Sequence, residues 1–259
     1  MKQFILRLYW ISTQFGFDPL KFYKSLIGLK KYFLDYIKFS SQNDINLTFK
    51  PCLNDWYAEA GSTINEYFLQ DLIVAQWVYA SNPIKHVDIG SRIDGFVAHV
   101  ASYREIEIFD VRPINTSIPN VNFRQLDLME NNFSTLQYGK CDSLSCLHTI
   151  EHFGLGRYGD PIQQNGYVTG LKNMASLLSK GGFFYFSTPI GKERVEFNAN
   201  RVFNPIKIYD LIIEIGFVLK KFLIIQDGNI VKEIKINVDE IKSLSNSNYN
   251  LGIFLFQKI

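Results

Sequence analysis

The sequence predicts an α/β domain with a mostly parallel, doubly wound sheet over residues 83–259, preceded by a helical N-terminal extension over residues 1–82. Two observations support this prediction. From Pro83 onward, short apolar runs alternate with polar or helix-like segments, a pattern typical of βαβ units. Near the end of the chain, two apolar runs flank Asp227-Gly228-Asn229, which is a hairpin signal. The parallel core is therefore expected to end in antiparallel strands.

The individual elements follow from periodicity and from turn residues. Helices are expected within 1–40 and at 63–80, 94–102 and 165–179. Strands are expected in the runs KHVDIG, EIEIFDV, NVNFRQLDL, CDSLSCL and GGFFYFSTP, and at Val218–Gln226, Ile230–Ile236 and Leu251–Gln257. Ser81-Asn82-Pro83 is a strong helix stop and separates the extension from the sheet domain.

The first 40 residues have a basic bias, and their apolar positions approximate a 3.6-residue period. A solvated cationic face above an apolar docking face would account for this pattern. Weak contact with an anionic membrane surface, or with a partner, would account for it as well.

Composition excludes several classes of protein. Of the 259 residues, 47% are apolar and 20% are charged, and the net charge is +2, so neither an acidic partner nor nucleic acid is indicated. No run approaches the roughly 18 apolar residues of a membrane span. Arg7 interrupts the apolar start, and no small-residue cleavage site follows it, so a signal peptide is not expected.

The cysteines and histidines indicate a reducing compartment, and we expect the protein to be cytoplasmic. Cys52, Cys141 and Cys146 are odd in number and form no CxxC pair. The four histidines include no HExxH motif and no pairing with cysteine at ligand spacing. Neither a disulfide framework nor a metal site is therefore expected.

The run Val87-Asp88-Ile89-Gly90-Ser91 carries the first functional signal. An apolar strand that ends in an acid and a glycine puts its turn at the carboxyl edge of a parallel sheet, where open α/β sheets bind ligands. Glycine lets the backbone approach a ligand closely, and a following helix directs free N–H groups to the same place.

Two further acids follow the next two predicted strands. Asp110 lies twenty positions after Gly90, where a doubly wound domain places the acid that accepts hydrogen bonds from ribose hydroxyls. Asp127, or its neighbouring backbone N–H, is positioned to meet an adenine edge, with Leu128 as an apolar face for the ring. Each acid alone could be a cap or turn residue, but three acids at successive strand ends are more specific.

The ordered series VDIGS, FDVRP, LDL, CDSLSCLHTIEH and LLSKGGFFYFSTP resembles the motifs of class I S-adenosylmethionine-dependent methyltransferases, over roughly residues 83–258. The resemblance implies S-adenosylmethionine as cofactor and a Rossmann-like sheet of seven strands in the order 3-2-1-4-5-7-6, the seventh antiparallel. The stretch LHTIEHFGLGRYGDPI at Leu147–Ile162 is similar to an uncharacterised methyltransferase-like family found in bacterial glycan-biosynthesis settings. That family does not identify a substrate, and we expect the methyl acceptor to be a small molecule or a sugar.

The resemblance also assigns the cofactor-binding residues. Asp88 and Gly90 would border the methionine moiety, and Asp110 would hold the ribose. Asp127 and Leu128 would contact adenine, and Leu147-His148 would lie beside the cofactor after the fourth strand. The glycine turn departs from the family pattern, because Arg92 and Asp94 occupy positions that usually hold glycine. Arg92 could narrow the pocket or face the cofactor's carboxylate, or the turn could have lost cofactor binding.

Glu151-His152 is the predicted catalytic pair, with His152 as the general base that removes a hydroxyl proton. His148 precedes His152 by four residues, so the two would share one face of a helix. In the alternative interpretation, Glu151 caps the helix and His152 packs against a loop. The acceptor side is expected to include Arg157, Tyr158 and Asp160.

Two other functions were weighed against methyl transfer. The altered glycine turn would suit a non-catalytic binding or scaffold protein, although the acids at 88, 110 and 127 favour cofactor binding. A nicotinamide-dependent oxidoreductase would need GxGxxG after the first strand, and Gly90-Ser91-Arg92-Ile93-Asp94-Gly95 lacks the middle glycine. The sequence does not identify the methyl acceptor, the acceptor atom or the oligomeric state.

Overall fold

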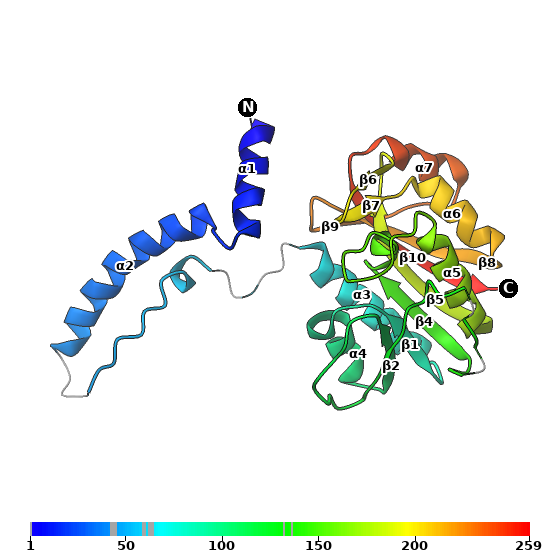
Figure 1. Ribbon diagram of the computed structural model, residues 1–259, viewed down its shortest axis with the longest axis horizontal. Helices are drawn as coiled ribbons and strands as arrows, with labels where there is room; N and C mark the ends of the chain where they lie inside the picture. Colours follow the sequence, from blue (N-terminus) through cyan, green and yellow to red (C-terminus); the bar gives the residue numbers. More distant parts are fainter. Residues whose placement is uncertain (1, 42–45, 59–60, 62–64, 132, 136) are drawn as a thin grey trace. The chain divides into compact units, whose positions relative to one another are not determined.

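The computed structural model describes residues 2–41, 46–58, 61, 65–131, 133–135 and 137–259. The chain forms two compact units, Met1–Ser62 and Thr63–Ile259. The first unit, blue to cyan in Figure 1, contains α1 (Lys2–Gln14), α2 (Pro19–Ser40) and the short 3₁₀ helix η1 (Asp55–Tyr57). None of the helices in these ranges combines the length and the hydropathy that crossing a bilayer requires.

Within the first unit, α2 begins where the sequence supplies a cap. The Asp18 carboxylate accepts hydrogen bonds from two backbone N–H groups of the first turn, and proline follows at the first helical position. The segment after α2 packs back onto it, with the Asn54 amide donating to Ser25 Oγ at 3.0 Å and the Lys31 ammonium 4.1 Å from the Trp56 ring centre. The helices expected within residues 1–40 are confirmed.

The second unit is built on an eight-stranded sheet in the order β3-β2-β1-β4-β5-β10-β8-β9. The strands are β1 (His86–Ile89), β2 (Ile106–Asp110), β3 (Val121–Gln125), β4 (Cys141–Leu147), β5 (Leu178–Ile190), β8 (Phe217–Gln226), β9 (Ile230–Glu233) and β10 (Asn250–Lys258). Strands β1 to β5 pair in parallel, and β10 runs antiparallel between β5 and β8. The predicted doubly wound α/β fold is confirmed.

The seven-stranded expectation is corrected to eight strands. Strand β9 extends the edge beyond β8 through the predicted hairpin, because Asp227 and Gly228 both adopt positive φ angles that allow a tight turn. A separate two-stranded ladder, β6 (Arg194–Glu196) with β7 (Asn200–Val202), follows β5.

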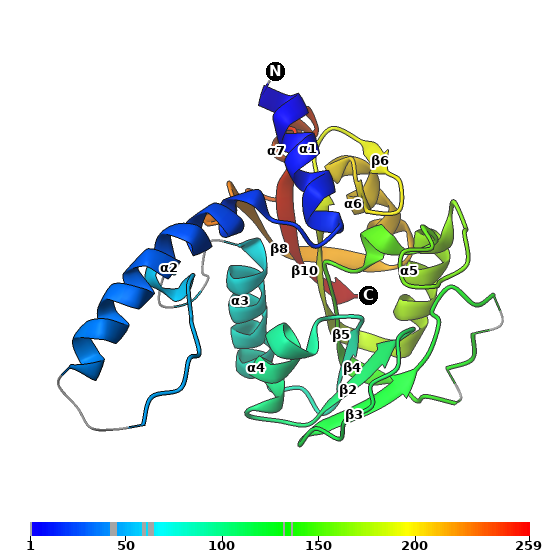
Figure 2. The same ribbon diagram turned by 60° about the vertical axis from the view of Figure 1, so that its left-hand side comes forward.

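Helices cover both faces of the sheet (Figures 1 and 2). They are α3 (Glu66–Ser81) and α4 (Ala98–Ala101) on one face, α5 (Gly166–Leu177) and α6 (Pro205–Glu214) on the opposite face, and α7 (Val238–Ser243) with the 3₁₀ turn η4 (Leu244–Asn246) beside α6. Each face has its own hydrophobic core. Val74 and Val100 belong to the α3–α4 side, and Met174 and Ile212 belong to the α5–α6 side.

Helix α3 belongs to the sheet unit and not to the extension, so the boundary between units lies before the expected one at 82/83. The physical reason is burial, because Val74 and Val78 are fully buried against the sheet. Tyr185 on β5 also donates a hydrogen bond to Ser81 Oγ at 2.8 Å. Asn82 then ends the helix in a left-handed conformation before Pro83.

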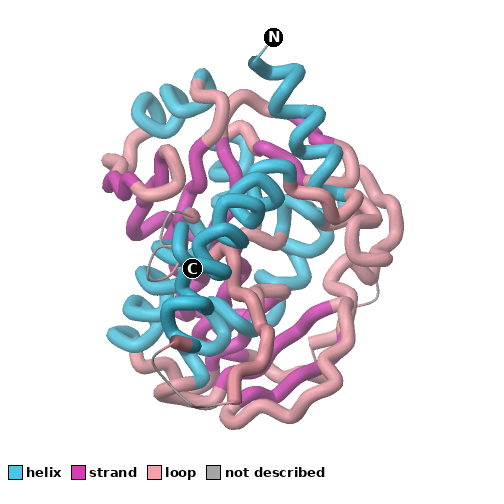
Figure 3. The backbone as a smooth tube through the Cα atoms, turned by 90° about the vertical axis from the view of Figure 1, so that its left-hand side faces the viewer, coloured by secondary structure: helices cyan, strands magenta, loops and turns pink. Residues whose placement is uncertain are grey.

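Loops connect β2 to β3 and β3 to β4; Figure 3 draws the loops of the chain in pink. In the part of the chain that the structure describes, residues 111–120 and 126–140 contain no helix. The helix expected at 94–102 is split into a π-helical turn, η2 (Ile93–Val97), and the short α4, with non-helical backbone at Gly95.

Candidate functional site

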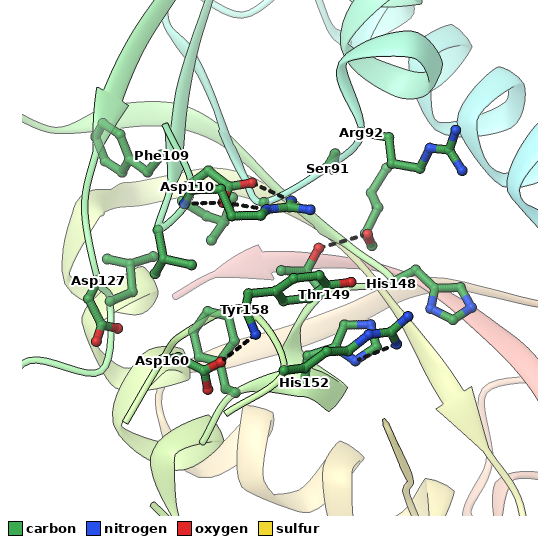
Figure 4. A pocket seen from close by; sticks show the side chains of 18 of the residues that line it. Ser91, Arg92, Phe109, Asp110, Asp127, His148, Thr149, His152, Tyr158 and Asp160 are labelled. Atoms are coloured by element: carbon green, nitrogen blue, oxygen red, sulfur yellow. Dashed lines mark hydrogen bonds and ion pairs between the residues drawn. The ribbon is translucent and has the colours of Figure 1, made fainter. Parts of the chain in front are cut away.

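A cavity open to solvent lies at the carboxyl ends of the parallel strands. Its empty space, counted out into the open solvent at its mouth, is about 900 Å³. Its walls come from α3, the turn after β1, the end of β2, the loop after β3 and the turn after β4 (Figure 4). The residues predicted from the sequence that line it are Gly90, Asp110, Asp127, Leu128, Leu147, His148 and His152.

The turn after β1 contains a glycine in a conformation that favours glycine. Gly90 has a φ of +70°, and its N–H donates to the Phe109 carbonyl at 2.9 Å. A Cβ at this position would collide with the Thr149 methyl group, which belongs to the turn after β4. Gly90 therefore lets the turns after β1 and β4 approach each other at the wall of the cavity.

Asp88, expected to border the methionine moiety, does not line the cavity. Its carboxylate is fully buried and accepts hydrogen bonds from the Ser91 N–H at 3.0 Å, the Ser91 hydroxyl at 2.8 Å and the Ser145 hydroxyl at 2.5 Å. Burial raises the pKa of Asp88 to about 7. The expected cofactor contact is thus replaced by a positioning role, because these bonds hold the turn that carries Gly90.

Arg92 and Asp94, the two departures from the glycine pattern, pair with each other at the rim. The Arg92 guanidinium donates to both Asp94 carboxylate oxygens, at 3.0 and 2.6 Å. Their side chains are 64% and 71% exposed. Arg92 lines the cavity, and in Figure 4 its guanidinium points away from Asp110.

Asp110 ends β2 at the cavity, as predicted, but a neighbouring cation already occupies its carboxylate. Arg112 donates to Asp110 Oδ1 from its backbone N–H at 2.8 Å and from Nε at 3.0 Å, and to Oδ2 from Nη2 at 2.6 Å. The Arg112 guanidinium also lies 4.4 Å from the Tyr158 ring centre. A ligand hydroxyl could reach Asp110 only by sharing or displacing these hydrogen bonds.

The loop after β3 brings Asp127 and Leu128 to the cavity wall. Asp127 Oδ1 accepts the Met129 N–H at 2.8 Å, which shapes a tight turn. Leu128 is buried in the main core, and its carbonyl accepts a hydrogen bond from the Asn173 amide at 2.8 Å. The turn therefore brings an apolar residue and a carboxylate together at the cavity wall; their contact with adenine stays a prediction.

The turn after β4 holds a bridge of ionisable side chains. His148 lies between two carboxylates, with Nδ1 bonded to Glu151 and Nε2 3.0 Å from Glu66 Oε1. Tyr249 donates to the same Glu66 oxygen at 2.5 Å, and the Tyr67 ring stacks on His148 with centres 4.5 Å apart. Burial opposes a charged imidazole, but the carboxylates outweigh it and raise the pKa of His148 to about 10.

The turn is not the continuous helix that would put His148 and His152 on one face. His148 has a φ of +52°, and only Ile150–His152 forms a 3₁₀ turn, η3. The turn nevertheless places Glu151 between the two histidines, with His152 Nε2 3.8 Å from Glu151 Oε1. Glu151 is fully buried behind the cavity wall, and the His148 charge lowers its pKa in spite of burial.

His152 lies on the cavity wall with one of its nitrogens fixed. Nδ1 donates to the Ala199 carbonyl at 2.7 Å, and Arg157 donates to the same oxygen at 2.9 Å. This bond assigns the proton to Nδ1 and leaves the Nε2 lone pair free. Burial lowers the pKa of His152, so the ring is neutral near pH 7.

The expected acceptor-side residues divide into two groups. Arg157 and Tyr158 line the cavity, and the Tyr158 ring meets His152 edge-on at 5.5 Å between centres. Asp160 lies on the wall, but its carboxylate accepts the backbone N–H groups of Gly154, Gly156 and Tyr158. Asp160 therefore shapes the loop after β4.

Sequence reasoning did not anticipate the contribution of α3, which lines the cavity with Tyr67, Gln70 and Asp71. Gln70 donates to Asp71 at 2.9 Å and accepts from the Ser187 hydroxyl at 2.5 Å. Burial raises the pKa of Asp71. The polar residues spaced within an otherwise apolar helix were the available signal.

Comparison with known proteins begins with a family model. The model described as "Caenorhabditis protein of unknown function, DUF268" matches residues 105–259. No curated protein matches the chain.

Solved structures resemble the chain at low sequence identity. The [4+2]-cyclase SpnF aligns over 73% of this chain and 80% of its own, with 12% identity and a TM-score of 0.51. The N-methyltransferase NodS from Bradyrhizobium japonicum, in complex with S-adenosyl-L-homocysteine, aligns over 78% and 91%, with 14% identity and a TM-score of 0.49. A TehB-like SAM-dependent methyltransferase from Corynebacterium glutamicum aligns over 77% and 91%, with 14% identity and a TM-score of 0.49. The likeness to SpnF concerns the fold alone, and it agrees with the sheet described above.

Proposed function

The chain belongs to the family described as "Caenorhabditis protein of unknown function, DUF268", and we propose that it is an S-adenosylmethionine-dependent methyltransferase that acts on a small molecule or sugar. The observation that carries the proposal is the convergence of Gly90, Asp110 and the Asp127–Leu128 turn on one cavity at the carboxyl ends of the strands. Free thiols at all three cysteines favour a cytoplasmic location.

The cavity walls fit the parts of this cofactor. Gly90 lets the turns after β1 and β4 meet at the cavity wall, and the Asp127–Leu128 turn brings an apolar residue and a carboxylate to that wall for an adenine ring. Asp110 supplies the acceptor for a vicinal diol once Arg112 gives up part of its pairing. When bound, S-adenosylmethionine supplies a methyl group activated by its sulfonium.

The other side of the cavity suits a hydroxylated acceptor. Tyr158 and Arg157 offer hydrogen-bond donors, and His152 offers a neutral imidazole whose Nδ1 is held by a backbone carbonyl. A base that is neutral near pH 7 can take the proton of an acceptor hydroxyl as that oxygen becomes nucleophilic. We therefore assign His152 as the proton acceptor, with Glu151 behind it.

Asp110→Ala is expected to weaken binding of S-adenosylhomocysteine by about 1–3 kcal/mol, because the ligand hydroxyls would lose a buried acceptor. Isothermal calorimetry measures the change. Asp210→Ala, an exposed acid on α6 outside the cavity, is the matched control and should bind as the wild type does. Arg112→Ala removes the cation from this ion pair and leaves the Asp110 carboxylate in place, so it should preserve or tighten the binding of S-adenosylhomocysteine. Equal affinity in the Asp110→Ala variant and the wild type would remove Asp110 from the cofactor site.

Arg92→Gly is expected to change the affinity for S-adenosylhomocysteine by less than about fivefold, since exposed ion pairs contribute roughly 0–1 kcal/mol. The physical reason is that the Arg92 guanidinium, at the exposed rim, is already paired with Asp94. Calorimetry with Asp94→Ala as a companion variant checks this. Strong tightening would mean that Arg92 blocks the cavity, and strong weakening would mean that it contacts the cofactor's carboxylate.

One observation favours the second candidate, a non-catalytic binding or scaffold protein. Arg112 donates to both oxygens of the Asp110 carboxylate. The same pairing would be found in a protein that no longer binds the cofactor, because the carboxylate would then always be occupied by the arginine. Transfer of labelled methyl from S-adenosylmethionine to a panel of monosaccharides and small hydroxylated metabolites separates the candidates. Cofactor-dependent product formation supports the methyltransferase. Binding of neither S-adenosylmethionine nor S-adenosylhomocysteine favours the scaffold.

A further inference from the structure

Three side chains of the turn after β4 converge on one point beside the cavity. His148, Glu151 and His152 each present one ligand atom, and these atoms all lie within 4.8 Å of one another. His148 Nδ1 is bonded to Glu151 Oε1, and His152 Nε2 lies 3.8 Å from the same oxygen. We propose that this cluster is a binding site for a divalent transition-metal cation, with His148 Nδ1, Glu151 Oε1 and His152 Nε2 as ligands.

The hydrogen bonds around the cluster support this assignment, because each imidazole has an oxygen acceptor for its second nitrogen. His148 Nε2 is 3.0 Å from Glu66 Oε1, and His152 Nδ1 is 2.7 Å from the Ala199 carbonyl. Metal-ligating histidines almost always donate their second N–H in this way, which fixes the tautomer and orients the ring. The nitrogens left over are the two that face Glu151.

The partners of these groups are fixed in turn. Tyr249 donates to Glu66 at 2.5 Å, and the Thr188 hydroxyl lies 3.3 Å from Glu151 Oε2. Glu66 comes from the start of α3, Thr188 from β5 and Tyr249 from the segment before β10. Three distant parts of the sheet unit therefore position the five-residue turn 148–152. A histidine that served only as a packed core residue would not need carboxylates on both nitrogens.

The position of the cluster leaves room for further ligands. His148 and His152 line the cavity, whereas Glu151 is fully buried behind them. A cation held by these three groups would keep coordination positions open toward the cavity, where an acceptor oxygen could bind and be polarised. Two imidazoles and one carboxylate suit Zn²⁺, Fe²⁺ or Mn²⁺.

The cation site deepens the proposed function, since it assigns a second role to His152. A cation replaces the proton between His148 and Glu151, and Nε2 of His152 then serves as a ligand and no longer as a proton acceptor. In the sequence the cluster has the spacing HxxEH at 148–152, which differs from the HExxH motif.

Mn²⁺ binding to the full chain, freed of metal with a chelator, tests the site through the electron paramagnetic resonance of free Mn²⁺. We expect one Mn²⁺ per chain. Glu66→Gln should weaken binding by about 10- to 100-fold, as loss of a partner that orients a ligand does, and His148→Ala and His152→Ala should weaken it further. His99→Ala is the control, because His99 lies on α4 outside the cluster, and it should bind Mn²⁺ as the wild type does.

A measurement on the wild type guards against variants that do not fold. Electron spin echo modulation of bound Mn²⁺ should show coupling to imidazole nitrogen from two histidines. Absence of nitrogen coupling, wild-type affinity in both histidine variants, or no binding of Mn²⁺ or Zn²⁺ at millimolar concentration would overturn the cation site. If the chain binds S-adenosylhomocysteine but does not bind Mn²⁺, only the cation site is contradicted. If it binds Mn²⁺ but does not bind S-adenosylhomocysteine, only the methyltransferase proposal is contradicted.

Discussion

Gly90→Ala is expected to lower the affinity for S-adenosylhomocysteine by roughly 100-fold, the order of magnitude by which a misplacement of about 1 Å lowers a catalysed rate. Gly90 has a φ of +70°, and a Cβ there would collide with the Thr149 methyl group. The turns after β1 and β4 must then separate, which changes the wall that both contribute to the cavity. Calorimetry measures the affinity, and thermal unfolding measures the accompanying loss of stability.

Gly139→Ala is the matched control for this experiment. Gly139 has a φ of +72°, so alanine there carries the same backbone strain, but no atom lies within 4 Å of the added Cβ. It precedes β4, at the edge of the sheet opposite the cavity. Both variants should lose stability, and only Gly90→Ala should lose binding. Equal affinity in the two variants would mean that the turn after β1 does not border the ligand.

His152→Ala is expected to lower the rate of methyl transfer by about 10²–10⁴-fold, while the affinity for S-adenosylhomocysteine stays nearly unchanged. His152 lies on the cavity wall, burial lowers its pKa, and the bond from Nδ1 to Ala199 keeps Nε2 available. The loss of turnover follows whether Nε2 accepts a proton or holds a cation.

Steady-state kinetics on an identified acceptor, together with calorimetry, provide the two readouts for His152→Ala. His99→Ala again serves as the control, because it removes an imidazole from α4 and leaves the cavity intact. Sensitivity of the wild-type rate to a chelator distinguishes the cation from the proton acceptor. A wild-type rate in the His152→Ala variant would exclude both roles.

The sequence predicted the sheet well because its strands are short apolar runs bounded by turn residues. Gly90, Asp110 and Asp127 were placed at strand ends by pattern alone, and parallel pairing then brings such ends to one edge of the sheet. Asp88, by contrast, lies behind the cavity wall for a local reason. The last residues of β1 alternate between faces, and the Asp88 carboxylate turns into the sheet toward Ser91 and Ser145.

The features that the sequence could not predict depend on contacts between distant segments. Helix α3 was assigned to the extension, yet its first turn provides Glu66 to His148, and Tyr249 reaches the same carboxylate from near the end of the chain. The bond from His152 to Ala199 likewise needs the β6–β7 ladder to fold back onto η3. No local pattern encodes such pairings, because loop lengths and helix packing set them.

The position of the Arg112 side chain is a local feature that the sequence pattern also did not predict. The motif FDVRP correctly placed Asp110 at the end of β2, but its spacing did not indicate that the arginine two residues later would fold back onto the carboxylate. A long side chain just after a strand can fold back onto the end of that strand or extend away from it. Which of the two conformations it adopts depends on the other side chains that fill the cavity. Here the Tyr158 ring supports the guanidinium from the opposite side.

Calorimetric titration of the full-length protein with S-adenosylhomocysteine tests the central claim most directly, because the claim is that the cavity between Gly90, Asp110 and Leu128 holds this cofactor. The account predicts saturable binding of one ligand per chain, with a matching rise in the unfolding temperature that Gly90→Ala reduces and Gly139→Ala preserves. No heat and no thermal shift at millimolar ligand would contradict it.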